Sequence, residues 1–64
     1  MEKRFYVTAD ASGRRIYGYY VRYDAGAVFR YFYVDKKAKI TATAALKSAN
    51  DLRDEMNERE NAKT

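Results

Sequence analysis

Four arginines recur at wide intervals through the first half of the chain, and aromatic residues lie between them. The set comprises Arg4, Arg14, Arg22 and Arg30, interleaved with Tyr6, Tyr20 and Phe32. A guanidinium group presents a planar fork of donors to phosphate oxygens and guanine edges, while an aromatic ring stacks on bases or packs against sugars. Residues of these types on one exposed surface would form a binding site for nucleic acid.

The charge of the chain is unevenly distributed. Residues 1–40 contain nine Lys or Arg against four Asp or Glu, a net charge of +5, whereas residues 41–64 contain four against five, a net charge of −1. Two of the basic residues, Lys36 and Lys37, precede the predicted helix, where they can contact the backbone of a bound strand. The first part of the chain is therefore expected to attract polyanions.

Several kinds of chemistry lack the residues that they need. The 64 residues include no Cys and no His, so thiolate nucleophiles, disulfides, the usual proton shuttle near neutral pH and the commonest metal ligand are excluded. The seven tyrosines are explained by packing in the core and at its edge, and they do not require a catalytic role. Three acidic residues of the predicted helix could attract a cation, namely Asp51, Asp54 and Glu55. A specific calcium or magnesium site needs further rigid oxygen ligands, which the sequence does not supply. We expect a protein that is not an enzyme and that holds no cofactor and no metal.

No segment of the sequence is suited to a membrane. The longest uncharged stretch, residues 40–46, has seven residues, whereas a spanning helix needs about 20. The sequence does not open with the basic, apolar and small-residue order of a signal peptide. We therefore expect a cytoplasmic protein that has no membrane partner.

The strands that must position the arginines follow from the hydrophobic pattern. Segments rich in aromatic and β-branched residues predict strands at about residues 3–9, 15–23 and 27–34. Turn residues separate them: Asp10 to Gly13 after the first strand, and a three-residue loop after the second in which Gly26 takes the left-handed position. The connections are short, which predicts an antiparallel meander.

After residue 41 the apolar positions recur at intervals of three and four, which predicts an amphipathic helix over about residues 41–59 and a tail at 60–64. Thr41 is the expected N-cap, and Asp35 is the alternative that would start the helix a turn earlier. The fold class is therefore α+β. We expect a single domain over residues 1–64, with the C-terminal helix packed on one face of a three-stranded sheet (βββα).

Strand alternation divides the side chains between two faces. If both hairpin loops have three residues, Ala9 lies opposite Arg15, and Tyr23 lies opposite Ala27. The face toward the helix then holds Phe5, Val7, Ala9, Tyr17, Tyr19, Val21, Tyr23, Ala27, Phe29, Tyr31 and Tyr33. The exposed face holds Arg4, Tyr6, Thr8, Arg14, Ile16, Gly18, Tyr20, Arg22, Val28, Arg30, Phe32 and Val34. The first loop can also be read as four residues long, and a slip of one residue would exchange the faces.

Three stretches carry a resemblance to a known family. They are residues 17–23 (YGYYVRY), residues 29–34 (FRYFYV) and Thr41 leading into residues 44–52 (AALKSANDL). The chain resembles the arm-binding domain of tyrosine-recombinase phage integrases and the related plant AP2-type domain. The resemblance implies that the sheet face reads DNA, with Arg14, Arg22, Arg30 and Tyr20 as the contacting residues.

The chain departs from this family in three respects. It lacks the recombinase catalytic domain and any Trp, and residues 35–41 replace the usual Gly-Phe-x-Thr approach to the helix. It would be a binding module and not a recombinase.

Other functions use the same surface. Small cysteine-free phage or mobile-element proteins, anti-CRISPR proteins among them, block a host protein or nucleoprotein complex, and Tyr and Arg are favoured anchors of protein interfaces. The arginines could instead serve solubility, because arginines on exposed strands deter aggregation. Self-association is a further alternative, since a homodimer would cover the free edges of the sheet. The residues predicted to contact nucleic acid or a protein partner are Arg4, Tyr6, Arg14, Tyr20, Arg22, Arg30, Phe32, Lys36 and Lys37.

Overall fold

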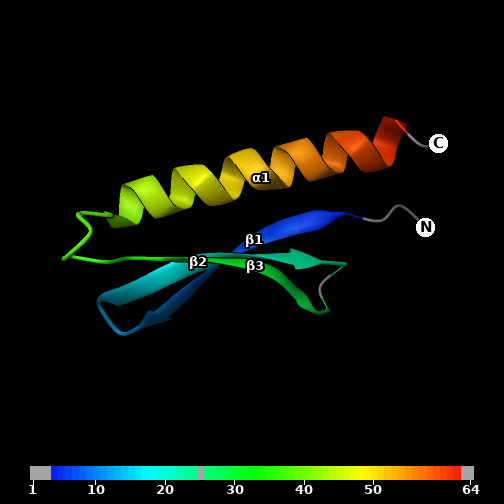
Figure 1. Cartoon of the computed structure of the whole chain (residues 1–64). Helices are drawn as coiled ribbons and strands as arrows, with labels where there is room; N and C mark the ends of the chain where they lie inside the picture. The colour runs from blue at the N-terminus through cyan, green and yellow to red at the C-terminus, as the bar shows by residue number, and fades with distance from the viewer. Residues whose placement is uncertain (1–3, 25, 63–64) are drawn as a thin grey trace.

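The chain folds as three strands followed by one helix, as the sequence predicts (Figure 1). The computed structural model describes residues 4–24 and 26–62. Its elements are β1 (Phe5–Ser12), β2 (Arg15–Tyr23), β3 (Val28–Tyr33) and α1 (Ala42–Ala62), and the antiparallel sheet has the order β1-β2-β3. The predicted α+β class is confirmed. Residue 3, the predicted start of the first strand, and residues 63 and 64 of the predicted tail lie outside the described residues, whereas residues 60–62 belong to α1.

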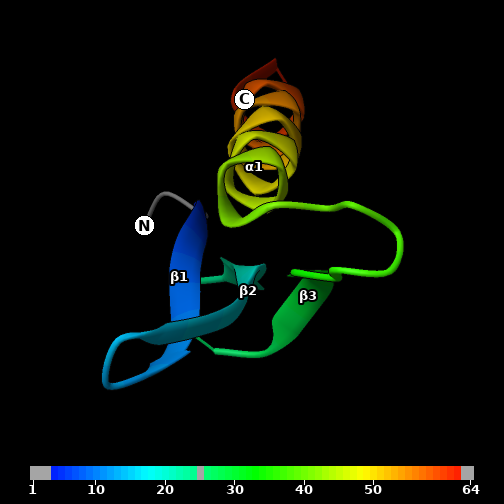
Figure 2. The same ribbon diagram turned by 90° about the vertical axis from the view of Figure 1, so that its left-hand side faces the viewer.

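A small core lies between α1 and one face of the sheet. The buried apolar residues are Phe5, Val21, Ala45 and Ala49. Around them pack the partly buried Val7, Tyr19, Tyr23, Phe32, Leu52 and Met56. The helix contributes small residues that let its backbone approach the sheet, and the strands contribute the large rings that fill the space. Figure 2 shows α1 above one face of the sheet only, so the other face, which we call the open face, is left uncovered by the described elements.

Two polar contacts fix the position of the helix. The Thr41 Oγ1 accepts a hydrogen bond from the Ala44 backbone N–H at 3.1 Å, which confirms Thr41 as the N-cap. Near the other end of α1, the Asn57 side chain pairs with the backbone of Phe5: its Oδ1 accepts from the Phe5 N–H at 2.6 Å, and its Nδ2 donates to the Phe5 carbonyl at 3.2 Å. The amide thus satisfies both backbone groups of one residue on the outer strand β1.

Asp35 does not start the helix. Its Oδ1 accepts hydrogen bonds from the backbone N–H groups of Lys37 at 2.9 Å and Ala38 at 3.3 Å. The backbone of Asp35 also pairs with Ile40 in an isolated antiparallel bridge. The segment between β3 and α1 is therefore a tight turn that carries lysines, and the alternative helix start at Asp35 is wrong.

The first hairpin loop is shorter than predicted. Ser12 lies opposite Arg15, so the loop has two residues, and Gly13 takes its first position with φ of 58°, as in a type II′ turn. The register also shifts by one residue between Asp10 and Ala11, where Tyr17 is an extra residue on β2, so Ala9 lies opposite Tyr19 and not Arg15. This register differs from the predicted one by four residues. Beyond the bulge, an even shift leaves each side chain on its predicted face, and Phe5, Val7 and Val21 do pack toward the helix. On the hairpin side of the bulge the shift is three residues, so Ile16, predicted on the exposed face, lies opposite Ala11 on the helix side.

A bulge near the second hairpin turn changes which face of the sheet the β3 side chains lie on. Near the turn, the Tyr23 N–H donates to the Ala27 carbonyl at 3.1 Å, as the predicted register requires. Farther along, Arg22 lies opposite Val28 while Val21 lies opposite Arg30, so Phe29 is an extra residue without a partner on β2. Such a bulge reverses the alternation of the strand beyond it.

The consequence is a correction to the predicted faces. Arg30 and Phe32 lie on the helix side of the sheet, opposite Val21 and Tyr19, whereas Tyr31 lies opposite Tyr20 on the open face. The same alternation puts Tyr33 on the open face, although both tyrosines were predicted to lie in the core. The left-handed residue of the second turn is also not the predicted Gly26. It is Asp24, with φ of 52°, a residue type that tolerates this conformation.

Candidate nucleic-acid interface

Tyr31 crosses the open face from β3 to β1. Its hydroxyl donates a hydrogen bond to the Asp10 Oδ2 on β1, and the ring passes over Gly18 on the central strand. A Cβ atom at Gly18 would lie 2.7 Å from the Tyr31 Cε1 and still closer to the Phe32 carbonyl oxygen. A glycine inside a strand marks a bulge or a position where another group lies close to the backbone, and at Gly18 the Tyr31 ring and the Phe32 carbonyl make that close approach. Gly18 is buried although it lies on the open face, because the Tyr31 ring covers it.

Two further tyrosines flank this ring. Tyr20 stacks on Tyr31 with ring centroids 5.7 Å apart and an interplanar angle of 12°, and Tyr33 lies on Tyr31 at 4.2 Å with an angle of 36°. We call Tyr20, Tyr31 and Tyr33 the tyrosine row. Tyr33 is 67% exposed, and Tyr6, on β1 of the same face, is 46% exposed. The open face therefore presents aromatic rings that are accessible to a planar ligand.

The bond to Asp10 changes the acidity of Tyr31. The hydrogen bond that the hydroxyl donates to the carboxylate raises the pKa of Tyr31 from 10.0 to about 12, with contributions from desolvation and from the negative charge of Asp10. The hydroxyl is therefore protonated at neutral pH and is held as a donor.

The four arginines do not gather on one face. Arg22 lies on the open face opposite Tyr6, and its Nε donates to the Gly26 carbonyl at 3.3 Å. Alternation along β1 places Arg4 on the open face too, since it precedes Tyr6 by two residues. Arg30 lies on the helix side, where its guanidinium carbon is 5.3 Å from the centre of the Phe32 ring. Arg14 lies in the first hairpin turn, so the predicted set of four is divided among three places.

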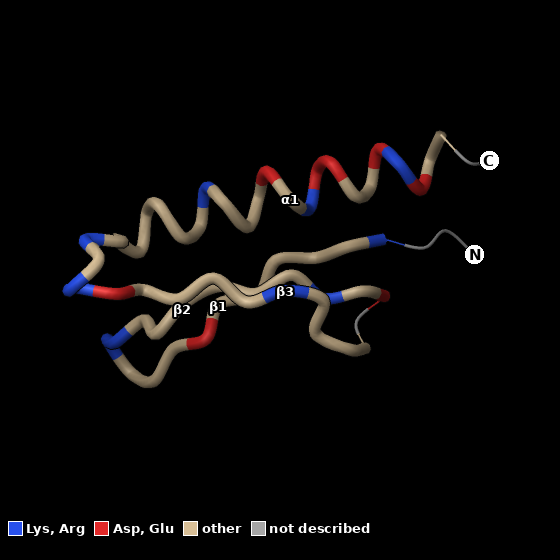
Figure 3. Tube along the Cα trace, in the orientation of Figure 1, with Lys and Arg blue, Asp and Glu red and all other residues tan. Residues whose placement is uncertain are grey.

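A second group of basic residues lies at one end of the molecule. There the β1–β2 hairpin faces the turn between β3 and α1, and Figure 3 shows Lys and Arg along both segments. Between them is an open pocket with a volume of about 550 Å³, whose lining includes Arg14, Arg15 and Lys36. We call it the end pocket. Arg14 and Lys36 were predicted as contact residues, whereas Arg15 was not.

The structure brings together part of the predicted site. Tyr6, Tyr20, Arg22 and Arg4 share the open face, and Arg14, Lys36 and Lys37 belong to the hairpin and turn at the basic end. Arg30 and Phe32 are separated from both groups. Sequence reasoning missed Tyr31, Tyr33 and Asp10, and the one signal that could have located Tyr31 was Gly18, because a glycine inside a strand marks a position where another group lies against the backbone.

Comparison of the chain with known protein families, with curated proteins and with solved structures finds no match. Of the described elements, none is a helix with the length and apolar character needed to cross a membrane. Within residues 4–24 and 26–62 there is also no group of three or more Asp or Glu side chains placed to hold a metal ion.

Proposed function

We propose that this chain is a small, non-enzymatic protein that binds DNA through the open face of its sheet. The observation that carries the proposal is the tyrosine row, which lies on the face that α1 leaves uncovered and shares it with Arg22 and Tyr6. Aromatic rings stack on bases, and arginines contact the phosphates between them.

The tyrosine row favours unpaired bases. A base inside a duplex presents only its edges to a protein, whereas an unpaired base offers its flat faces for stacking. Stacking of one base on an aromatic side chain contributes about 1–3 kcal/mol. We therefore expect single-stranded DNA to bind more tightly than a duplex of the same sequence, with Tyr33, the most exposed of the three rings, in direct contact with a base.

The distribution of charge supports binding of DNA on the sheet side of the molecule. In Figure 3 the acidic residues lie mainly along α1, while basic residues lie along the sheet and the turns at its end. The first 40 residues carry a net charge of +5 and the remainder −1. A polyanion would therefore approach the sheet side of the molecule and not the outer side of the helix.

The family resemblance points in the same direction. The arm-binding domains of phage integrases share the order of three strands and a helix, and DNA binding through the sheet is what the resemblance implies for this chain. The bulge at Phe29 alters the expected contact set, however, since it removes Arg30 from the open face and adds Tyr31 and Tyr33. We further propose a cytoplasmic location, in keeping with a chain that contains no Cys.

Binding of labelled single-stranded DNA, measured by fluorescence anisotropy over a range of salt concentrations, tests the proposal. Affinity should fall as salt rises, because binding releases counterions. Tyr33→Ala should weaken binding by about tenfold, which corresponds to the loss of roughly 1.4 kcal/mol of stacking.

Two arginines form a matched pair for the same measurement. Arg22→Gln removes a charge from the open face, whereas Arg30→Gln removes the same charge from the helix side. We expect Arg22→Gln to weaken binding and to reduce the salt slope by about 1, and Arg30→Gln to do so much less. Absence of binding at low salt, or equal effects of the two variants, would contradict binding through the open face.

A second function is favoured by the apolar residues that β3 exposes. Val28 is 56% exposed and Phe29 50% exposed at the start of β3, and Tyr33 is 67% exposed at its end. A protein partner would cover this area, as expected for a phage-type inhibitor that binds a host protein. Such a function predicts a stoichiometric complex with one protein that persists after nuclease treatment. Recovery of nucleic acid alone from a pull-down would rule it out.

A further inference from the structure

No member of the tyrosine row lines the end pocket, whose lining has a mixed character. It opens between the β1–β2 hairpin and the turn that leads into α1, and Ile16 and Ala42 contribute apolar surface to it. Its volume of about 550 Å³ is within the range of roughly 300–1,000 Å³ that is typical of small-molecule sites. The pocket therefore has room for a ligand the size of one nucleotide.

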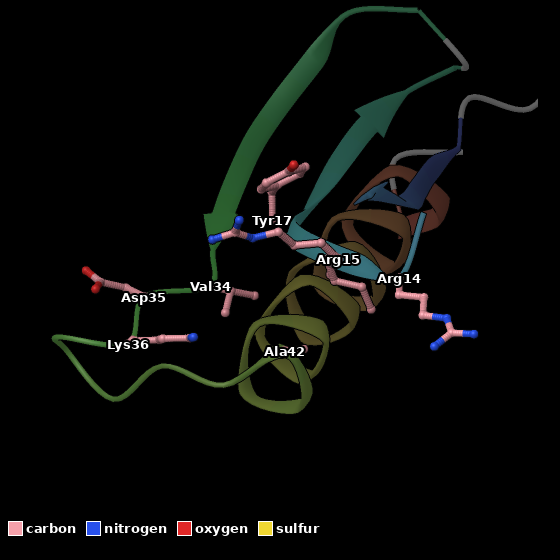
Figure 4. Close-up of a pocket in the computed structure, with 8 residues that line it drawn as sticks. Arg14, Arg15, Tyr17, Val34, Asp35, Lys36 and Ala42 are labelled. Atoms are coloured by element: carbon pink, nitrogen blue, oxygen red, sulfur yellow. The ribbon is translucent and has the colours of Figure 1, made fainter. Parts of the chain in front are cut away.

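Cationic groups extend along the pocket. Figure 4 shows the guanidinium of Arg15 and the ammonium of Lys36 on the side where β3 leaves the sheet, with Arg14 extending on the other side. Three basic residues and one acidic residue, Asp35, line the pocket, which gives the lining a net charge of +2. Among residues 4–24 and 26–62, no acidic side chain forms an ion pair with Arg14, Arg15 or Lys36.

Arg15 is held in position by a neighbouring ring. Its guanidinium carbon lies 5.6 Å from the centre of the Tyr17 ring, a cation–π contact. A guanidinium that rests on an aromatic face keeps its donors directed outward in its own plane, where they can bind a phosphate. The acidic neighbour Asp35 is engaged elsewhere, since its Oδ1 accepts from two backbone N–H groups of the turn.

The start of α1 adds to the positive potential. Ala42, the first residue of the helix, lines the pocket, and the first turn of α1 contains no acidic residue. The partial positive charge of a helix N-terminus favours an anion at this end. The helix dipole and the side chains of Arg15 and Lys36 thus act on the same volume.

We propose that the end pocket binds a nucleoside monophosphate unit, either free or at the end of a DNA strand. The phosphate lies between Arg15 and Lys36, and the base packs against the apolar surface of Ile16 and Ala42. The choice of a nucleotide over other phosphorylated planar ligands rests on the proposed function, whereas the phosphate site rests on the geometry of the pocket alone.

Titration of the isotope-labelled protein with adenosine monophosphate, followed by nitrogen–proton correlation spectra, tests this assignment. The amide signals of residues 14–17 and 34–36 should shift in a saturable manner, while those of Tyr20 and Tyr31 should not. Adenosine without phosphate, and inorganic phosphate without a base, should each bind more weakly than the nucleotide. If no shifts localise to these residues, the pocket is not a nucleotide site.

Charge variants make the test specific. Arg15→Gln should weaken binding of adenosine monophosphate by about tenfold, the effect of losing one charge-assisted hydrogen bond, and Lys47→Gln is the matched control because Lys47 is an exposed cation on α1. Equal weakening by both variants would overturn the proposal, since it would show a general effect of charge.

A third titration compares DNA strands with and without a terminal phosphate. Tighter binding of the phosphorylated strand that is lost in Arg15→Gln places the site at strand ends, and no difference between the strands limits it to free nucleotides.

The outcomes also separate this inference from the proposed function. If the nucleotide does not bind but DNA binding still depends on Tyr33, the end pocket is rejected and the open-face proposal stands. If the nucleotide binds with the expected dependence on Arg15 but no DNA binds, the open-face proposal is rejected and the pocket stands.

Discussion

Substitution of Gly18 by alanine should destabilise the protein strongly, because the added methyl group has no space. The new Cβ would lie 2.7 Å from the Tyr31 Cε1 and 3.2 Å from the Tyr33 Cα, and it would lie closest to the Phe32 carbonyl oxygen. Ordinary contact begins at 3.4 Å, so the Tyr31 ring would have to retreat by about 0.7 Å and the β3 backbone by more.

The expected loss is about 2–4 kcal/mol in the free energy of unfolding. Overpacking of a rigid site costs roughly 1–3 kcal/mol, and displacement of Tyr31 would add to this cost by breaking its hydrogen bond to Asp10. At roughly 0.05–0.15 kcal/mol per residue, a chain of 64 residues has a total stability of about 3–10 kcal/mol. The substitution would thus remove a large fraction of the total.

Urea unfolding followed by circular dichroism measures this loss, and the other two glycines serve as controls. Gly13→Ala meets no atom within 4 Å but forces an alanine to φ of 58°, which costs about 1–2 kcal/mol. At Gly26 the nearest atom is 3.5 Å away and φ lies outside the left-handed region, so the change should stay within about 0.5 kcal/mol. The expected order of destabilisation is Gly18, then Gly13, then Gly26.

A Gly18→Ala protein as stable as Gly26→Ala would refute the placement of Tyr31 across β2. It would mean that the ring lies elsewhere on the open face. The tyrosine row, on which the proposed function depends, would then have no structural basis.

Two further predictions concern single contacts. Asn57→Ala should lower stability by about 2 kcal/mol, because it leaves the Phe5 N–H and carbonyl without their side-chain partner; unchanged urea unfolding would show that the helix does not depend on this amide. Alkaline pH should destabilise the fold through Tyr31: since its folded pKa of about 12 exceeds the unfolded value of 10.0, the stability it contributes is complete below pH 10 and is lost as the pH rises toward 12. Tyr31→Phe should lack this part of the pH dependence in urea titrations, and an identical pH profile for both proteins would contradict the bond to Asp10.

The sequence predicts the elements of this fold better than the faces of its strands. Aromatic and β-branched runs located the strands, and the period of the alanines with Thr41 located the helix and its N-cap. Residues 5–10 and 18–23 lie on their predicted faces although their register differs from the prediction, because an error of four residues preserves alternation. Ile16 lies on the other face, because the bulge at Tyr17 makes the error three residues at the hairpin end.

The faces of β3 could not be predicted in this way. One unpaired residue, Phe29, reverses the side-chain alternation of β3, and β3 contains no glycine that would mark the position of this bulge. Its position is determined by contacts between distant residues, among them the Phe29 ring against Phe5 at 5.2 Å. The amide pairing of Asn57 with Phe5 was missed for the same reason, because it joins residues 52 positions apart.

The hydrogen bond from Tyr31 to Asp10 ties the two outer strands together across the central one. The ring that it anchors is the one on which both Tyr20 and Tyr33 rest, so all three aromatic planes are ordered before any ligand arrives. Association on this surface should therefore incur little loss of side-chain entropy. A calorimetric titration should accordingly show a favourable enthalpy with only a small entropic penalty. The conformation of the sheet should not change when a base binds.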